Sequence, residues 1–454
     1  MREELNRMCT SDQGSATRCA PPATEPVARD RRGDRRCRAR RGALAAAVAA
    51  VGLTNAACGG DDGGGGGGSA KGGSLTIYSS LPLQGAARNQ AVATVNGIKL
   101  KLKQVGNKVG KYTIKYVSLD DSTAARGGWD AGRTAENGRK AATDDAAIAY
   151  IGEFNSGATA VSLPLLNEAG IAMVSPGNTA VGITSDAPGA EKGEPDKYYP
   201  TGERTYARIL PNDTYQGAAI AALAKEQHCA SAYIVNDGEV YGSGLGRNVE
   251  IAAKKVDLEI KANERIDVKA ASFRSLAAKI ESSGANCFVF TGITANKAAQ
   301  VFTDVAAALP DVPLIGPEGV GESAFFDPKE GGLPPKIAKR VLITIPGVAP
   351  EEYPPAGQKF LADYKAEYGD EDPDRYAVYG YEAISLILDA IQRAGAKGGD
   401  RAAVVEQIFA TKDREGVVGT YGIDKNGDIT LTPYGAYRIK DGELVFDHRV
   451  QPQN

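Results

Sequence analysis

Two short polar segments follow predicted strands and contain groups suited to holding a small charged molecule. Ser156 and Gly157 open a predicted helix, where the first backbone N–H groups have no helical partner and the helix dipole is positive. Such a helix start favours a carboxylate, and the Ser156 hydroxyl adds a donor. Thr179 in a neighbouring predicted loop adds another donor, and Asn178 beside it offers an amide. Ser156 and Asn178 also have ordinary explanations, the first as the cap of its own helix and the second as a residue that tolerates a left-handed turn.

A second group of side chains offers the opposite charge. Glu318 lies between Pro317 and Gly319 just after a predicted strand, where a carboxylate can pair with an ammonium through charge-assisted hydrogen bonds. The alternative is a solvated loop glutamate. Tyr241 also follows a predicted strand and combines an apolar face with a hydroxyl, although it could equally pack on a surface. Tyr381, near the start of a late predicted helix, is a further candidate for lining the same site, as is Tyr379.

Reactive groups of the usual enzyme classes are missing from the sequence after residue 57. Its two histidines, His228 and His448, have no partner motif, and no cysteine–histidine set has zinc spacing. There is no nucleophile elbow and no phosphate loop, and the glycines of 242–246 lack the dinucleotide spacing. Residues 424–428 mimic half a calcium loop without its later glutamate, so a turn is favoured. The sequence therefore predicts a binding protein with no catalytic residue, no metal and no cofactor.

The elements that must position these residues are short apolar strands alternating with amphipathic helices. The predicted strands fall into two series, 75–79, 112–119, 147–152 and 171–175, then 233–236, 288–291 and 314–316. The predicted helices are 157–169, 217–226, 244–254, 272–282, 296–309, 376–394 and 401–410. This alternation implies βαβ units with mostly parallel sheets, and two series imply two α/β lobes. Because ligands bind beyond the carboxyl ends of parallel strands, the polar segments should face one cleft.

The end of the chain departs from this alternation. Residues 421–446 are predicted to form short antiparallel strands, with Lys425-Asn426-Gly427-Asp428 as a hairpin turn. The sequence after residue 57 is long enough for two domains. It holds 42 basic and 50 acidic residues, a net charge of −8, which argues against nucleic acid or anionic lipid as a partner.

The first 73 residues have the pattern of an export signal and a tether. Arginines in 35–41 precede the uncharged stretch 43–57, which at about 15 residues is short of the ~20 that span a bilayer. The segment is similar to a bacterial lipoprotein signal, with Cys58 as the lipidated residue, although Asn55 stands where an aliphatic residue is usual. The alternative is a cleaved signal with an incidental cysteine. Residues 59–73 are glycine-rich and predict a flexible linker of roughly 20 Å.

Two cysteines remain in the body of the chain, Cys229 and Cys287. Export permits a disulfide, and both cysteines precede apolar runs that could form neighbouring strands. The sequence leaves two explanations open, a disulfide or two small buried apolar residues.

Three segments together resemble one known family. They are residues 169–179 (Ala-Gly-Ile-Ala-Met-Val-Ser-Pro-Gly-Asn-Thr), 208–217 (Arg-Ile-Leu-Pro-Asn-Asp-Thr-Tyr-Gln-Gly) and 316–321 (Gly-Pro-Glu-Gly-Val-Gly). In order and spacing they resemble the substrate-binding proteins of branched-chain-amino-acid-type ABC importers, which have the type I periplasmic binding fold. The resemblance covers residues 75–450, and segment 86–96 departs from the family's glycine-rich pattern.

The resemblance assigns roles to the candidate residues. It implies that Ser156, Gly157 and Thr179 hold the α-carboxylate of an amino acid, that Glu318 pairs with its ammonium, and that Tyr241 covers it. It also implies ABC permease and ATPase subunits as partners. We expect a monomer at the outer face of the cytoplasmic membrane or in the periplasm, bound to the membrane only through its lipid. A sensor with the same fold, or a binder of an amide, urea or aromatic acid, remains the alternative.

The resemblance also implies a division of the chain. The leader is 1–57 and the lipidated linker 58–73. The first lobe comprises 74–209 plus 347–412, and the second comprises 210–346 plus 413–454. Three hinge crossings are expected near 210–211, 345–347 and 411–414.

Overall fold

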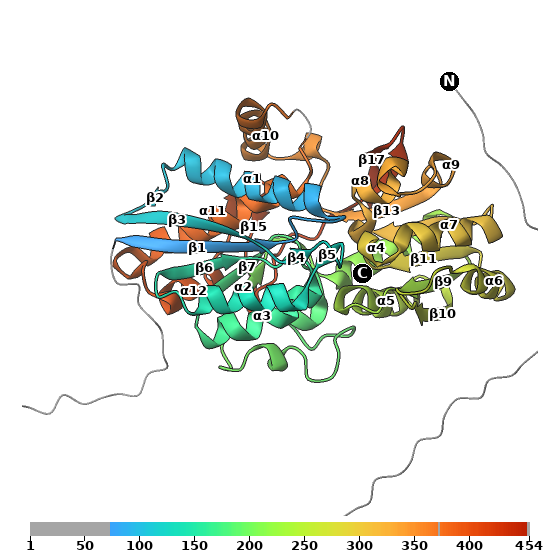
Figure 1. The fold of residues 1–454 in the computed structure, drawn as a ribbon, viewed down its shortest axis with the longest axis horizontal. Coiled ribbons are helices and arrows are strands. Elements are labelled where there is room, and N and C mark those ends of the chain that lie inside the picture. Colours follow the sequence, from blue (N-terminus) through green and yellow to red (C-terminus); the bar gives the residue numbers. More distant parts are fainter. Residues whose placement is uncertain (1–72, 371–372, 452–454) are drawn as a thin grey trace, which may run out of the picture. The chain divides into compact units, whose positions relative to one another are not determined.

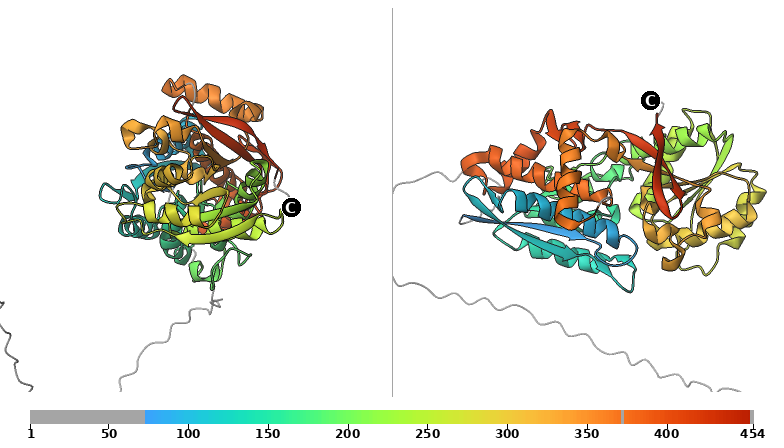
Figure 2. Two further views of the ribbon diagram at one scale, coloured as in Figure 1. Left: turned by 90° about the vertical axis from the view of Figure 1, so that its right-hand side faces the viewer. Right: turned by 90° about the horizontal axis from the view of Figure 1, so that it is seen from above.

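The computed structural model describes residues 73–370 and 373–451 and has two mixed sheets flanked by helices (Figures 1 and 2). We call each sheet with its helices a lobe. Most neighbouring strands in both sheets are parallel, so the predicted α/β class is confirmed. Cys58 and the predicted leader lie outside the described residues. No described helix is long and apolar enough to cross a bilayer.

The first sheet has the strand order β2-β3-β1-β6-β7-β8 and is parallel except for β2. Its strands are β1 (Ser74–Leu81), β2 (Lys108–Val109), β3 (Tyr112–Asp120), β6 (Ala147–Ile151), β7 (Ala172–Ser175) and β8 (Tyr206–Arg208). Its helices are α1 (Arg88–Gln104), α2 (Ala131–Ala142), α3 (Ser156–Glu168), α10 (Pro355–Tyr368), α11 (Tyr376–Ala394) and α12 (Arg401–Phe409). Alternate residues of a strand supply opposite faces: Val174 packs with α1 and α11, whereas Met173 packs with α2 and α3.

The second sheet has the order β10-β9-β11-β12-β13-β16-β17, in which the first five strands are parallel. Its strands are β9 (Ser231–Asn236), β10 (Glu259–Arg265), β11 (Cys287–Thr291), β12 (Leu314–Pro317), β13 (Val341–Pro346), β16 (Tyr434–Lys440) and β17 (Glu443–Val450). Its helices are α4 (Asp213–Glu226), α5 (Val240–Ala253), α6 (Arg274–Ser282), α7 (Ala298–Ala308), α8 (Ser323–Phe326) and α9 (Pro335–Ala338). Helices α4 and α5 cover one face, and α6 and α7 the other.

A disulfide joins Cys229 and Cys287, whose Cα atoms are 5.8 Å apart. Cys287 opens β11, and Cys229 lies just before β9, the strand that pairs with β11. The bond therefore fastens two central strands of the second sheet at their amino ends.

Helices α1 and α11 cross at two glycines. A Cβ placed on Gly97 would lie 2.0 Å from the carbonyl oxygen of Ala377, and one on Gly380 would lie 2.1 Å from that of Thr94. The two backbones are thus in direct contact, which only glycine permits. This crossing fixes α1, whose first turn reaches the pocket described below.

Connections between the lobes run through residues 209–212, 347–354 and 430–433. The third lies later than the expected 411–414. Residues after 413 first form the hairpin of β14 (Arg414–Gly416) and β15 (Gly419–Tyr421), and Tyr421 and Ile429 pack in the core of the first lobe. The second lobe therefore resumes at Tyr434 rather than at residue 413.

A buried ion pair explains why the segment around residue 428 stays with the first lobe. The Arg208 guanidinium, with no exposed surface, donates from Nε to Asp428 Oδ1 at 2.6 Å. The expected hairpin turn at 425–428 is a turn closed by a single bridge between Ile423 and Ile429. The long terminal hairpin instead turns at Asp441-Gly442, where both φ angles are positive, and joins β16 to β17.

Candidate ligand-binding site

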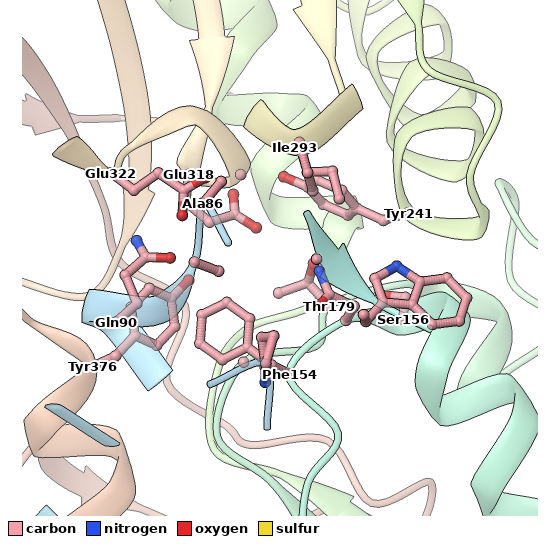
Figure 3. A pocket seen from close by; sticks show the side chains of 18 residues that line it. Ala86, Gln90, Phe154, Ser156, Thr179, Tyr241, Ile293, Glu318, Glu322 and Tyr376 are labelled. Atoms are coloured by element: carbon pink, nitrogen blue, oxygen red, sulfur yellow. The ribbon is translucent and has the colours of Figure 1, made fainter. Parts of the chain in front are cut away.

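One pocket is lined by both lobes near the carboxyl ends of their strands (Figure 3). It encloses about 560 Å³ of empty space, part of which is open to solvent. Its lining residues are Pro82, Ala86, Ala87, Gln90, Gly128, Trp129, Phe154, Asn155, Ser156, Gly177, Thr179, Tyr241, Ile293, Ala295, Glu318, Gly319, Glu322 and Tyr376. Four of the residues predicted from the sequence, Ser156, Thr179, Tyr241 and Glu318, meet here.

The start of helix α3 faces this pocket without a side-chain cap. Asn155 occupies the N-cap position, and its side chain makes no capping hydrogen bond. Ser156 is 2 % exposed, and its hydroxyl oxygen accepts the N–H of Ala180 at 3.3 Å, which leaves its proton free for a ligand. Ser156 is therefore the first helical residue and does not cap the helix. Together the open N–H groups and this hydroxyl form a site for a carboxylate.

The loop after β7 contributes one of its two candidate residues. Thr179 is buried and lines the pocket, and its carbonyl accepts the N–H of Asp213 at 2.9 Å. Asn178 does not line the pocket. Its Nδ2 donates to Thr159 Oγ1 at 2.6 Å and its Oδ1 accepts from Arg208 at 3.4 Å, so it shapes the loop that presents Thr179.

Gly157 has no side chain, and this makes room for the ring of Trp129. A Cβ there would lie 2.5 Å from the ring of Trp129, which covers the start of α3. Trp129 ends the hairpin of β4 (Ser122–Thr123) and β5 (Gly128–Trp129), and it is the only tryptophan in the sequence. Trp129 was not among the predicted site residues, although the glycine pair at 127–128 is a turn signal.

Glu318 enters the pocket from the second lobe at the start of the 3₁₀ turn η4 (Glu318–Val320). It is 6 % exposed and accepts a hydrogen bond from Gln216 Nε2. Gln216 Oε1 in turn accepts from the Tyr241 hydroxyl at 3.1 Å. Burial, helped by the nearby Asp213 carboxylate, raises the pKa of Glu318 to about 8, while Tyr241 and Gln216 oppose the rise.

A second carboxyl group, that of Asp213, is buried close to Glu318 behind the wall of the pocket. It has no exposed surface, and neither of its carboxyl oxygens makes a hydrogen bond within the described part of the chain. Burial raises its pKa to about 7, against the lowering influence of Thr179 and Arg208. A cation bound beside Glu318 would reduce this unfavourable accumulation of carboxyl groups.

The remaining wall of the pocket holds residues that sequence reasoning did not find. Tyr376 packs on Phe154 with ring centroids 4.6 Å apart, and Gln90 and Glu322 lie close by (Figure 3). Gln90 projects from the first turns of α1, a helix that was not among the predicted elements. Glu322 lies four residues after Glu318 and directly follows segment 316–321, which carries the family resemblance.

The structure corrects the choice of Tyr381. Its hydroxyl donates to Gln104 Oε1 at 2.7 Å in a groove between α1 and α10, away from the pocket. Tyr379 is also absent from the pocket lining and donates to the carbonyl of Pro346 at 3.1 Å. The helical period decides this outcome, because only Tyr376, at the start of α11, reaches the pocket.

Comparison with known proteins places this geometry in a family. A family model described as "Periplasmic binding protein" matches residues 75–443. The "Amino acid binding protein" of Pseudomonas aeruginosa is 25% identical over 297 residues, which cover 65% of this chain and 73% of the relative. The "Leu/Ile/Val-binding protein" of Escherichia coli K12 is 25% identical over 378 residues, covering 81% of this chain and 88% of the relative.

Solved structures share the fold. A leucine binding protein LivK from Thermotoga maritima superposes with a TM-score of 0.71 at 22% identity, covering 83% of this chain and 99% of that one. A solute binding protein of R. palustris in complex with benzoate has a TM-score of 0.67 at 20% identity, covering 84% and 97%. The resemblance predicted from the sequence is thus confirmed, and the chain belongs to the periplasmic binding protein family.

Proposed function

We propose that this chain is the extracytoplasmic solute-binding protein of an ABC importer and that it captures an amino acid in the pocket between its lobes. One observation carries the proposal: a single pocket has free donors for an anion at α3 and a buried carboxylate, Glu318, on the other lobe. These two ends match the two charges of an amino acid. The names of the relatives, amino acid and Leu/Ile/Val-binding proteins, support this class of ligand.

The charges of the pocket favour an amino acid over an aromatic acid. Both ligands carry a carboxylate for the start of α3, but an aromatic acid has no ammonium to pair with Glu318. It would cover that carboxyl group without supplying an opposite charge, which costs binding free energy. Urea and simple amides lack the carboxylate.

The first lobe captures the ligand, and the second lobe then closes over it. The ligand carboxylate binds first to Ser156, Thr179 and the N–H groups of α3 on the first lobe. The second lobe then turns about the connections between the lobes and brings Glu318 and Tyr241 onto the ligand. Contacts at the rim support the closed arrangement, such as Asn89 Nδ2 donating to Ser323 Oγ at 3.2 Å.

The closed form is the one that the permease recognises, and a separate ATPase subunit drives release. The binding protein itself has no catalytic role. It is a monomer, exported and held at the outer face of the membrane by lipid on Cys58. A pull-down from membranes that recovers permease subunits fits this function, whereas recovery of a kinase or cyclase would favour the sensor alternative.

Trp129 offers a direct test, because the only tryptophan in the sequence lines the pocket. Titrating the purified protein with the common amino acids should change its tryptophan emission for at least one of them, and calorimetry should give the affinity. Benzoate should produce no such change. If benzoate or urea binds and no amino acid does, the proposal is wrong.

Glu318→Gln is the matching variant. It should weaken amino-acid binding by about tenfold or more, roughly 1.4 kcal/mol, because it removes the charge that pairs with the ammonium. Glu281→Gln makes the same change at an exposed position of α6 and should leave the affinity as it is. Calorimetry that finds equal affinities for wild type and Glu318→Gln would reject the assigned role.

A further inference from the structure

The amino-acid site of the proposed function occupies only one side of the pocket. In Figure 3, Ser156 and Thr179 lie on the right of the view, while Gln90, Tyr376 and Glu322 lie on the left. All three left-hand side chains line the pocket, and none is required by an α-carboxylate or an α-ammonium. They come from α1, α11 and the turn after η4, so the fold brings them together from distant parts of the chain.

Gln90 is a buried polar side chain without a partner. It is 4 % exposed, and the hydrogen bond it accepts from Thr94 Oγ1 goes to its backbone oxygen. Within the described residues its amide forms no hydrogen bond, and it faces the pocket. The Tyr376 hydroxyl is likewise unpaired within the described residues. Both groups open onto the pocket, and a ligand that covered them without a hydrogen bond would bury them unpaired, so they point to a polar group on the ligand.

Glu322 indicates that this polar group of the ligand is positively charged. It is 5 % exposed, and burial raises its pKa to about 8. The carboxylates of Asp374 and Glu330 add to the rise, and only the Thr294 hydroxyl opposes it. No lysine, arginine or histidine lines the pocket. Among the residues that line the pocket Glu322 therefore has no cation beside it, and a cation bound there would favour its ionised form.

Two acids line the pocket, Glu318 and Glu322, and the two charges of a simple amino acid leave one of them over. The ligand carboxylate goes to the start of α3, and its α-ammonium goes to Glu318. Glu322 then remains without an opposite charge unless the ligand carries a second cation. Between the two ends, Phe154, Tyr376 and Ala86 offer apolar surface for an aliphatic stem, and the aromatic faces also attract cations.

We propose that the ligand is an α-amino acid with a cationic side chain, whose terminal ammonium or guanidinium is held by Glu322, Gln90 and Tyr376. The proposal rests on the proposed function, since it needs the α-carboxylate and α-ammonium at the other end. The Glu322 carboxylate, the Gln90 carbonyl and the Tyr376 oxygen all accept from the cation. An aliphatic side chain would leave these three buried groups unpaired, and a site built for hydrogen bonding rejects such a ligand.

Calorimetry with three ligands tests this, using L-lysine, L-arginine and L-norleucine. Norleucine has the straight carbon chain of lysine without its terminal ammonium. Wild type should bind lysine or arginine at least about tenfold more tightly than norleucine. Glu322→Gln should lose at least about tenfold in affinity for the basic amino acid but less than about threefold for norleucine. Glu281→Gln, the same change at an exposed position of α6 outside the pocket lining, should alter neither.

Gln90→Leu probes the same subsite from the first lobe and should weaken lysine or arginine binding while strengthening norleucine binding. Thermal unfolding of each variant checks that it is folded. Tighter binding of leucine, norleucine or glutamine than of both basic amino acids would overturn the cationic ligand and leave the amino-acid function standing. Failure of every amino acid to bind would instead overturn the proposed function.

Discussion

Glu318 lines the pocket and has the buried carboxyl group of Asp213 as a neighbour. Burial raises the pKa of Glu318 to about 8 and that of Asp213 to about 7, so Glu318 keeps its proton at neutral pH. A bound ammonium favours the ionised form of Glu318 and lowers its pKa. Ligand binding below pH 8 must therefore release a proton, and the affinity for an amino acid should rise with pH up to about that value.

The same shift predicts how the stability of the empty protein depends on pH. In the unfolded chain, Glu318 loses its proton near the ordinary value of 4.5, whereas the folded protein keeps it up to about 8. Between these values the unfolded state binds fewer protons, so the free energy of unfolding should fall as pH rises. Urea unfolding of Glu318→Gln, which cannot ionise here, should give a free energy of unfolding that gains on wild type from pH 5 to pH 8. A constant difference between the two proteins would contradict this.

Single residues of the site could be predicted only where they follow strands. Ser156, Thr179 and Glu318 lie within five residues of the ends of apolar strands, and parallel sheets bring such positions to one edge. Gln90 and Tyr376 lie on helices, where the face that meets a pocket depends on how the helix packs. Nothing in the local sequence sets that rotation, so these two escaped prediction.

At the scale of elements, the crossing of α1 and α11 holds one wall of the pocket in place. Gly97→Ala should destabilise the protein by roughly 1–3 kcal/mol, because the new methyl would overlap the carbonyl oxygen of Ala377 at the crossing. Gly244→Ala is the matched control within helix α5. Its Cβ would meet only the end of Arg247 at 3.8 Å, so the better helix propensity of alanine should stabilise by up to about 1 kcal/mol. Urea unfolding measures both, and equal effects would show that the crossing is not tight.

Strands and helices with a strong apolar pattern were predicted close to their observed bounds. The predicted helix 376–394 matches α11, and the predicted strand 288–291 lies within β11 (Cys287–Thr291). The terminal hairpin lies later in the sequence than predicted, because it turns at Asp441-Gly442 and not at 425–428. Asp428 in the earlier turn bonds Arg208 of the first lobe, and a single bridge between Ile423 and Ile429 closes that turn, so no strands pair around it.

At the scale of the whole molecule, the disulfide should contribute to stability without touching the pocket. Cys229 and Cys287 are 58 residues apart in sequence. Closing a loop of that size lowers the entropy of the unfolded chain and so raises the free energy of unfolding by about 2–4 kcal/mol. Reducing the bond should lower the midpoint of urea unfolding and leave amino-acid affinity unchanged while the protein is folded. The double variant Cys229→Ala/Cys287→Ala should show the lower midpoint with and without reductant. Identical midpoints for oxidised and reduced wild type would contradict the prediction.

The Arg208–Asp428 pair has a mechanical consequence for such a molecule. The same guanidinium donates to the carbonyl of Ala180 at 2.8 Å, and the same carboxylate accepts from Asn212 Nδ2 at 2.9 Å. These bonds therefore hold three segments together as one rigid block: the loop that contains Thr179, the residues just after β8, and the residues that lead to β16. In the proposed closure the second lobe turns beyond these bonded residues, so its pivot lies within a few residues of Thr179, the proposed carboxylate site.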